Sequence, residues 1–101
     1  MKIKGYENYE IFEDGRIVNK LGRILKCGIG NHGYKQTELW KDGIRKGFLL
    51  HRLLALHFIP NPENKYSVDH ENRDPLDNRL CNLSWATKEE QNANQIGRAH
   101  V

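Results

Sequence analysis

The chain has 101 residues, a length that one compact domain fills. Apolar residues make up 38% of it and mean hydropathy is −0.78, which argues against a membrane-spanning segment. The net charge of +3 is unevenly distributed, since residues 16–52 hold nine basic and two acidic residues, whereas residues 63–90 hold seven acidic and four basic ones. This asymmetry suggests a surface that binds a polyanion next to a site that binds a cation, although ordinary surface charge gives the same pattern.

The first half of the chain predicts short antiparallel strands joined by tight turns. Asp14-Gly15 and Asp42-Gly43 each separate two β-prone runs, and glycine tolerates the positive φ that hairpin turns need. The expected strands are residues 9–12, 16–19, 23–26, 34–40 and 44–48. The glycine-rich residues 27–33 are expected to form a connector.

A helix is predicted next, over residues 50–58. Apolar and aromatic side chains recur there at helical spacing, and Pro60 ends the run. Residues 61–64 then have the composition of a turn, and residues 66–70 that of a short strand. Trp40 and Trp85 are expected in the core.

The remaining segment predicts a polar loop, a strand and a second helix. Residues 71–79 form the loop, and residues 80–85 return as a strand that Asn82 opens. Thr87 and Glu90 fit the capping-box pattern, so we expect a helix from Thr87 to about Gln95.

Cysteine usage and the first residues limit the location of the protein. Cys27 and Cys81 form no Cys-x-x-Cys pair, which excludes a cysteine-rich zinc site, and we expect no disulfide in a reducing compartment. The first residues lack the apolar run of a signal peptide. We therefore expect a cytoplasmic protein that does not bind membranes.

Polar residues of one chemical kind gather at the junctions of the second half. Asp69 and His70 end one strand, Asn82 opens the next, and Gln91 and Asn92 lie in the last helix. Carboxylate and amide oxygens suit Mg²⁺ or Mn²⁺, and an imidazole beside them can act as a base. Consecutive strand residues point to opposite faces, however, so Asp69 and His70 converge on one site only if the strand ends there.

These residues occur within a pattern that resembles the HNH endonucleases of phage and group I intron origin. The pattern comprises residues 51–55, 58–64, 68–70, 78–79, 82–87 and 91–92. Residues 5–17 also resemble the β module that often precedes this nuclease domain. The resemblance implies an α+β fold, in which N-terminal antiparallel hairpins and a helix precede a ββα-metal (His-Me finger) unit. We expect a β module over residues 1–49 and a nuclease unit over residues 50–101, together forming one compact structure.

The resemblance also implies roles for individual residues. His70 matches the general base, Asp69 matches one metal ligand, and Asn82 matches the residue that braces the loop and helps to orient the base. The second ligand comes from the last helix. Gln91 stands where the family commonly places asparagine and Asn92 follows it, two positions that differ by about 100° around a helix. We take Asn92 as the ligand and leave Gln91 as the alternative.

The resulting hypothesis is a metal-dependent DNA endonuclease. One Mg²⁺ or Mn²⁺ ion, held by Asp69 and Asn92, would serve a single site that nicks duplex DNA, leaving 5′-phosphate and 3′-hydroxyl ends. The basic residues expected to contact DNA are Arg16, Arg23, Lys26, Lys35, Lys41, Arg45, Lys46 and Arg52. We expect a monomer, with a dimer as the alternative, encoded by a phage or mobile element and acting in a bacterial host.

Two other functions are compatible with parts of the sequence. A non-catalytic DNA-binding module derived from such a nuclease would keep the basic surface, and a glutamine at the true ligand position would favour it. An RNA-binding protein ranks last, because the predicted strands lack a clustered pair of exposed aromatic residues that could stack on single-stranded bases. Homing members often carry a further C-terminal DNA-binding module. Because the present sequence ends soon after the predicted helix, we expect little sequence readout.

Overall fold

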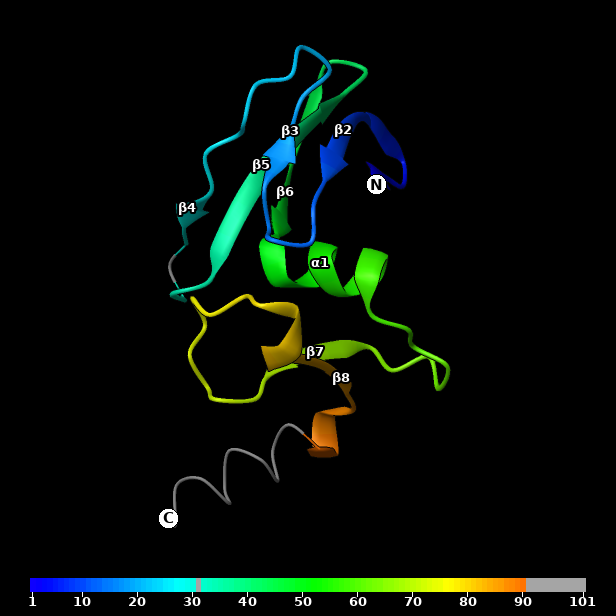
Figure 1. Ribbon diagram of the computed structural model, residues 1–101, viewed down its shortest axis with the longest axis vertical. Coiled ribbons are helices and arrows are strands. Elements are labelled where there is room, and N and C mark those ends of the chain that lie inside the picture. The colour runs from blue at the N-terminus through cyan, green and yellow to red at the C-terminus, as the bar shows by residue number, and fades with distance from the viewer. Residues whose placement is uncertain (31, 91–101) are drawn as a thin grey trace.

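The computed structural model describes residues 1–30 and 32–90. Within them, eight strands form three small antiparallel sheets around one α-helix (Figure 1). The elements are β1 (Lys2–Ile3), β2 (Tyr6–Ile11), β3 (Ile17–Val18), β4 (Gly28–Ile29), β5 (Lys35–Lys41), β6 (Ile44–Leu49), α1 (Leu50–Phe58), β7 (Ser67–His70), the 3₁₀ helix η1 (Leu80–Asn82) and β8 (Leu83–Ala86). We call residues 1–49 the β module and residues 50–90 the α1–β7–β8 unit.

The first sheet has the strand order β1-β2-β3. In the predicted hairpin Ile11 pairs with Ile17, and Gly15 in the turn has a φ of +91°. Both isoleucines are fully buried, so the hairpin contributes its apolar side chains to the core. The β1 strand was not predicted, because two residues are too short to show a periodic pattern.

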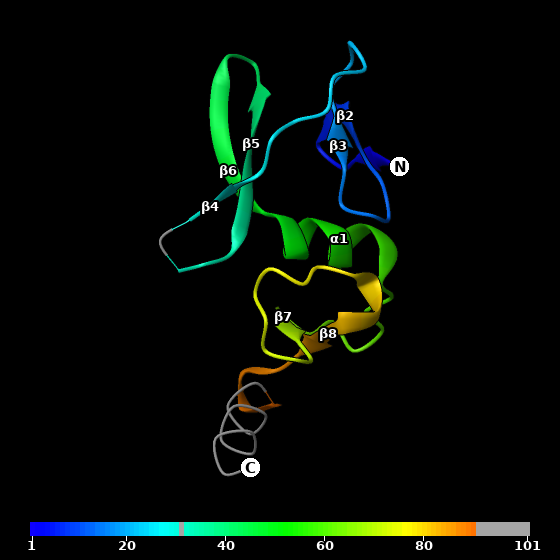
Figure 2. The ribbon, with the colours of Figure 1, turned by 60° about the vertical axis from the view of Figure 1, so that its left-hand side comes forward.

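The second sheet has the strand order β4-β5-β6, and β5 and β6 form its long hairpin (Figure 2). Asp42 and Gly43 connect the strands with φ angles of +52° and +77°, the pair of positive values that a type I′ turn requires. Thr37 and Leu39 are buried and alternate with exposed residues along β5. The hairpin therefore packs one face on the core and exposes the other.

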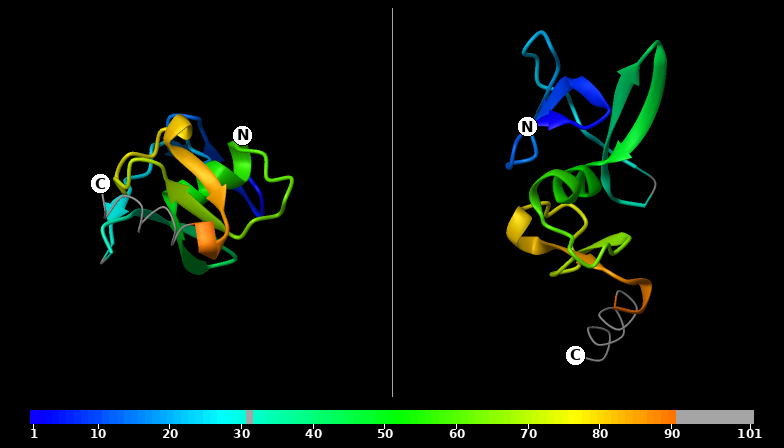
Figure 3. Two further views of the ribbon diagram at one scale, coloured as in Figure 1. Left: turned by 90° about the horizontal axis from the view of Figure 1, so that it is seen from below. Right: turned by 90° about the vertical axis from the view of Figure 1, so that its right-hand side faces the viewer.

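Helix α1 lies between the two halves of the molecule. It contacts β5 and β6 on one side and β7, β8 and η1 on the other, as the side view in Figure 3 shows. Leu50, Leu53, Leu54 and Ala55 of this helix are buried. The core cluster draws on both halves and consists of Ile3, Tyr9, Ile11, Ile17, Leu39, Leu50, Leu53, Leu54, Ala55, Val68 and Leu83. In the described part of the chain no helix is long and apolar enough to cross a membrane.

Three local predictions were wrong. Residues 23–26 do not form a strand, since only a single bridge joins Ile24 to Val18. Asn82 does not open the second strand of the β7–β8 hairpin but ends the 3₁₀ helix η1, and β8 begins one residue later. Trp40 is not in the core, because its side chain lies on the outer face of the β5–β6 hairpin with an exposed fraction of 53%.

The capping box at the start of the last helix is confirmed. The Thr87 hydroxyl accepts a hydrogen bond from the Glu90 amide, and a Glu90 carboxylate oxygen accepts one from the Thr87 amide, at 3.1 and 3.0 Å. Residues 88–90 are helical, and the predicted remainder of the helix lies outside the described residues.

Candidate active site

The β7–β8 hairpin sets the directions of the two central side chains of the predicted site. His70 pairs with Leu83 and Asp69 pairs with Ser84 in an antiparallel register. Val68 and His70 are buried on the face toward α1, whereas Asp69 alternates with them and is half-buried. Asp69 and His70 therefore belong to opposite faces of the hairpin, at the end of β7 where the loop begins.

The imidazole of His70 is buried among groups from three separate segments. Its Nε2 lies 2.8 Å from Oδ1 of Asn78, which belongs to the loop after β7. The ring of His51 in α1 lies 4.8 Å away between centroids, and that of Tyr34 lies 5.9 Å away. The exposed fraction of His70 is 5%. One ring nitrogen thus lies beside Asn78, and the ring packs against the stacked pair of His51 and Tyr34.

His51 is a second buried imidazole beside the predicted base. Burial lowers its pKa to about 4, and the neighbouring charges of His70 and Arg52 add to this effect. Tyr34 stacks on its ring, with centroids 5.2 Å apart and an angle of 28° between planes. His51 is therefore neutral at pH 7 and places no positive charge against His70.

Asn82 braces the loop between β7 and η1 from the inside. Its Oδ1 accepts a hydrogen bond from the Asn72 amide at 3.1 Å, and its Nδ2 donates to Asn72 Oδ1 at 3.0 Å and to the Asp77 carbonyl at 2.8 Å. The backbone adds a further tie, because the Glu71 amide donates to the Asn82 carbonyl. Asn82 thereby holds the loop that also carries Asn78, the residue whose Oδ1 lies beside His70 Nε2.

Of the two predicted metal ligands, only Asp69 falls within the described residues. Its carboxylate suits Mg²⁺ or Mn²⁺, which proteins often hold through one or two carboxylates together with substrate phosphate and water. Asn92 and its alternative Gln91 lie outside the described residues. Within residues 1–30 and 32–90, no group of three His, Cys, Asp or Glu side chains is arranged to hold a metal ion.

The predicted DNA-contacting residues have different environments. Arg23, Lys26, Lys41, Arg45 and Lys46 are exposed on the segment after β3 and on the β5–β6 hairpin, and Lys35 at the start of β5 is half-buried. Arg16 and Arg45 are ion-paired, with Asp14 at 2.8 Å and Glu38 at 2.6 Å.

Arg52 makes contacts within the protein. Its Nη1 donates to the Tyr66 carbonyl at 2.6 Å, and its guanidinium lies over the rings of Tyr66 and Trp85.

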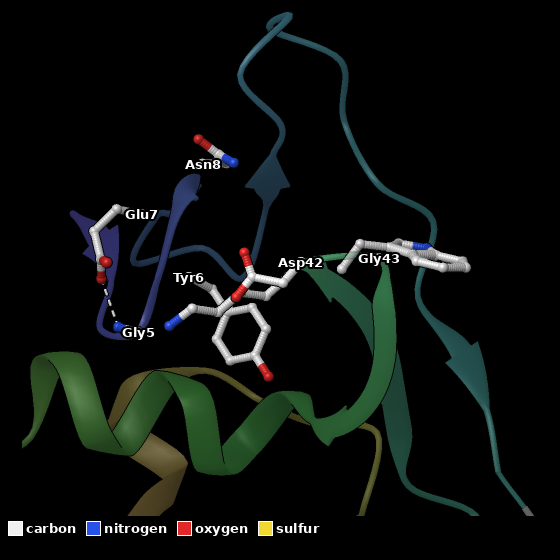
Figure 4. A pocket seen from close by; sticks show the side chains of 8 residues that line it. Gly5, Tyr6, Glu7, Asn8, Asp42 and Gly43 are labelled. Atoms are coloured by element: carbon white, nitrogen blue, oxygen red, sulfur yellow. Dashed lines mark hydrogen bonds between the residues drawn. The ribbon is translucent and has the colours of Figure 1, made fainter.

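Two hollows lie near these residues. One of about 550 Å³ is bordered by Asn78, by Lys35 at the start of β5 and by Glu13 and Asp14 before β3. The other, of about 290 Å³, lies between the β1–β2 turn and the tip of the β5–β6 hairpin (Figure 4). Glu7 accepts a hydrogen bond from the Gly5 amide on its wall, and none of the predicted catalytic residues lines it. The first hollow is bordered by Asn78, whose side chain contacts His70, but His70 itself does not line it.

Sequence reasoning assigned no role to three residues of this site. Asn78 is part of the HNH-like pattern but carried no predicted function, and Tyr34 was expected only as a strand residue. His51 matched the pattern at the start of the helix without a stated contact to His70. His51 and Tyr34 are 19 and 36 positions from His70, so only the tertiary fold brings their rings to it, whereas Asn78 is 8 positions away in the following loop.

Comparisons with known proteins identify relatives of this chain. Residues 48–93 match the family model described as HNH endonuclease. The chain is 38% identical over 98 residues to DNA endonuclease I-HmuI of Bacillus phage SP01, an alignment that covers 95% of this chain and 56% of that protein. It is 33% identical over 91 residues to H-N-H endonuclease F-TflII of Escherichia phage T5, with 87% and 47% covered.

A solved structure extends the similarity to the fold. The structure described as DNA binding and cleavage by the HNH homing endonuclease I-HmuI matches with a TM-score of 0.91 and 36% identity. The match covers all of this chain and 59% of that one. The chain thus spans about half the length of these two phage relatives.

Proposed function

Because this chain belongs to the HNH endonuclease family, we propose that it hydrolyses phosphodiester bonds in duplex DNA and nicks one strand. The observation that carries the proposal is the buried imidazole of His70, one nitrogen of which is held 2.8 Å from the Asn78 oxygen. A general base must present a lone pair in a fixed direction, and the packing around His70 supplies this constraint. The adjacent Asp69 adds the carboxylate that phosphodiester chemistry needs for a cation.

In the proposed reaction His70 acts as the general base and Asp69 as a ligand of the metal ion. His70 takes a proton from a water molecule, and the resulting hydroxide attacks phosphorus in line with the 3′-oxygen. The bond from phosphorus to that oxygen breaks, the oxygen takes a proton from solvent, and the products carry a 5′-phosphate and a 3′-hydroxyl. Asp69, together with Asn92, would hold one Mg²⁺ or Mn²⁺ ion. When bound, such an ion stabilises negative charge on the phosphate and on the departing oxygen.

The β module would hold the DNA through its phosphates. Lys41 and Lys46 are exposed on the β5–β6 hairpin and have no acidic partner among the described residues. Arg23 and Lys26 are exposed on the segment after β3, which runs beside β5 in Figures 1 and 2. Contacts of this kind position a duplex and carry no sequence information by themselves. With one site in one chain, a single-strand nick is the expected product.

A plasmid assay tests this function directly. Supercoiled DNA is incubated with the protein and Mg²⁺ or Mn²⁺, with an EDTA control and the His70→Ala variant. We expect conversion to open circles that requires both the ion and His70, with a rate loss on the order of 10³-fold in the variant. DNA binding by His70→Ala should equal that of the wild type, since the side chain is buried and lies outside the basic surface.

Two outcomes would contradict the proposal. If His70→Ala nicked at the wild-type rate, the assignment of the base would be wrong. If neither ion supported nicking but gel shifts showed salt-sensitive DNA binding, the chain would be a non-catalytic DNA-binding module.

A further inference from the structure

A tyrosine of the β module lies against both buried histidines of the predicted site. The ring of Tyr34 lies 5.2 Å from that of His51 and 5.9 Å from that of His70, between centroids. The two imidazoles lie 4.8 Å apart, so each of the three rings contacts the other two. Tyr34 directly precedes β5, His51 lies in α1 and His70 ends β7. The β module therefore supplies part of the surroundings of the predicted base.

We propose that Tyr34 is a positioning residue, whose ring fixes the orientation of the His70 imidazole and so makes the β module part of the nuclease site. The inference rests on the proposed function, because the orientation matters to the reaction only if His70 is the base. A base has to face the proton that it takes, so a loss of orientation lowers the rate without weakening the binding of DNA. The β module would then contribute to catalysis as well as to contacts with phosphates.

Backbone hydrogen bonds hold Tyr34 at the end of its turn. The Gly30 amide donates to the Tyr34 carbonyl at 3.0 Å, and the Gly33 amide donates to the Gly30 carbonyl at the same distance. A Cβ added to Gly33 would lie 3.9 Å from Cγ of Pro75, so the turn before β5 reaches the loop after β7 (Figure 1). The ring of Tyr34 is thus carried from the β module to the end of β7.

The packing of Tyr34 favours a role at the site over one in the core. The partly buried apolar side chains that pack against the core cluster are, among the described residues, Tyr6, Leu25, Cys27, Phe48, Phe58, Ile59, Leu80 and Trp85. Tyr34 is half-buried but is not one of them. Its ring contacts in this part of the chain are those with His51 and His70. Tyr34 therefore packs on the predicted site and not on the apolar core.

The angles between the rings indicate what Tyr34 adds to the other contacts of His70. Tyr34 and His51 are stacked, with 28° between their planes, and His70 is tilted against this pair by 33° and 50°. A contact at one edge atom, such as that of Nε2 with the Asn78 side chain, fixes a point of the imidazole. Packing against neighbouring rings restricts its plane, because it involves many atoms at once. Tyr34 and His51 together supply this restraint.

The order of the His70 ring is measurable by NMR without DNA or a metal ion. ¹³C relaxation of the histidine-labelled chain reports how far each imidazole moves on the picosecond to nanosecond timescale. Tyr34→Leu removes the ring but keeps an apolar side chain, whereas Tyr34→Phe keeps the ring and lacks only the hydroxyl. We expect Tyr34→Leu to lower the order parameter of the His70 ring, and Tyr34→Phe to leave it at the wild-type value.

Nicking kinetics supply a second measurement on the same variants. In Tyr34→Leu we expect kcat to fall on the order of tenfold, with KM and the gel-shift affinity for DNA at their wild-type values. Tyr34→Phe should keep the wild-type kcat, because its ring packs in the same way.

Tyr6→Leu is the matched control. Tyr6 is also a half-buried tyrosine of the β module, but its ring contacts Phe48 at 5.1 Å and packs against the core cluster. Urea titration should show that this variant loses at least as much stability as Tyr34→Leu. Its kcat and the order parameter of His70 should nevertheless stay at the wild-type values.

Each outcome separates this inference from the proposed function. An unchanged order parameter of His70 or an unchanged kcat in Tyr34→Leu would overturn the role of Tyr34, even if the protein is a nuclease. Equal losses in Tyr34→Leu and Tyr6→Leu would assign the effect to general destabilisation, and a defect in Tyr34→Phe as large as that in Tyr34→Leu would assign it to the hydroxyl. Either result would also overturn the inference. Wild-type nicking by His70→Ala would instead refute the proposed base, with the measured ring order still standing.

Discussion

The β module and the α1–β7–β8 unit place their polar side chains in opposite ways. In the β module the basic residues are mostly exposed, and Thr37 is its one buried polar residue among those described. In the α1–β7–β8 unit three polar side chains are buried, each with an exposed fraction of 6% or less: His51, His70 and Asn82. The charge follows the same division, with a net +7 over residues 16–52 and −3 over residues 63–90.

This difference determines how each region should respond to substitution. Hydrogen bonds between buried polar groups are stronger than those in water because the surrounding dielectric constant is low. Removing one partner leaves the other buried and unpaired, which lowers the stability of the fold. Exposed cations act through long-range fields that salt screens, and their effects are small and nearly additive. Changes in the α1–β7–β8 unit should therefore be large and local, whereas changes in the β module should be graded and dependent on salt.

The largest effect is expected for Asn82→Ala. The substitution removes three side-chain hydrogen bonds to Asn72 and Asp77 and leaves buried partners unpaired. We expect a loss of about 3 kcal/mol in the free energy of unfolding, measured by urea titration. Nicking should fall as well, because the loop that carries Asn78 loses its brace, while DNA binding at low salt should persist.

Asn61→Ala is the control for this change. Asn61 also brackets a turn, with its side chain donating to the Lys65 carbonyl and accepting from the Lys65 amide at 2.8 and 2.9 Å. Its loss should cost about 1 kcal/mol and leave nicking intact, since the turn at residues 61–65 does not touch His70. Equal losses of stability and nicking in the two variants would remove the distinction between the buried site and an ordinary turn.

A pH-dependent loss of stability is expected next, from His51. Its pKa is about 4 in the fold and about 6.5 when unfolded, so the unfolded chain binds the extra proton between these values. Stability should therefore fall as pH decreases from about 6.5 to 4, by about 3 kcal/mol in total. His51→Phe keeps an aromatic ring against Tyr34 but cannot titrate. Urea titrations at pH 7, 5.5 and 4 should show a smaller acid loss in the variant, and parallel losses would contradict this account.

Local chemistry made much of the fold predictable. Asp42-Gly43 predicted its hairpin correctly because few residue pairs accept two positive φ angles, and Thr87 with Glu90 predicted a helix start because the two side chains bond each other's backbone. These signals lie within four residues, so sequence alone contains the interaction that produces the structure. The same holds for the helix at residues 50–58, whose apolar spacing directly reflects its buried face.

The errors and omissions have a different physical origin. Residues 23–26 have strand composition but gain only one bridge, because strand formation depends on a partner that the local sequence does not specify. Trp40 is apolar enough for a core but falls on the outer face of β5, where it pairs with Arg45. The contacts of His70 with His51 and Asn78 arise from packing between separate segments. No spacing rule could have supplied them.

For the basic surface we expect graded effects. Replacing Lys41 and Lys46 together by glutamine should weaken DNA binding about tenfold at low salt, roughly equally over different sequences. The slope of log affinity against log salt should fall by about two, because each lysine neutralises about one phosphate. Arg16→Gln is the matched control, since Arg16 is already paired with Asp14 and has less charge to offer. A loss confined to one sequence would indicate base readout in place of phosphate contact.

The smallest effects should come from two glycines of the β5–β6 hairpin, which separate backbone conformation from packing. An added Cβ would meet nothing within 4 Å at either Gly43 or Gly47, but only Gly43 has a positive φ, at +77°. Gly43→Ala should therefore destabilise the protein by about 1 kcal/mol through backbone strain alone. Gly47→Ala should stabilise it by about 0.5 kcal/mol, because alanine loses less conformational entropy in a strand. The two substitutions could instead change the free energy of unfolding in the same direction in urea titrations. The hairpin would then respond to side-chain contacts, as the α1–β7–β8 unit does, and the contrast between the two regions would not hold there.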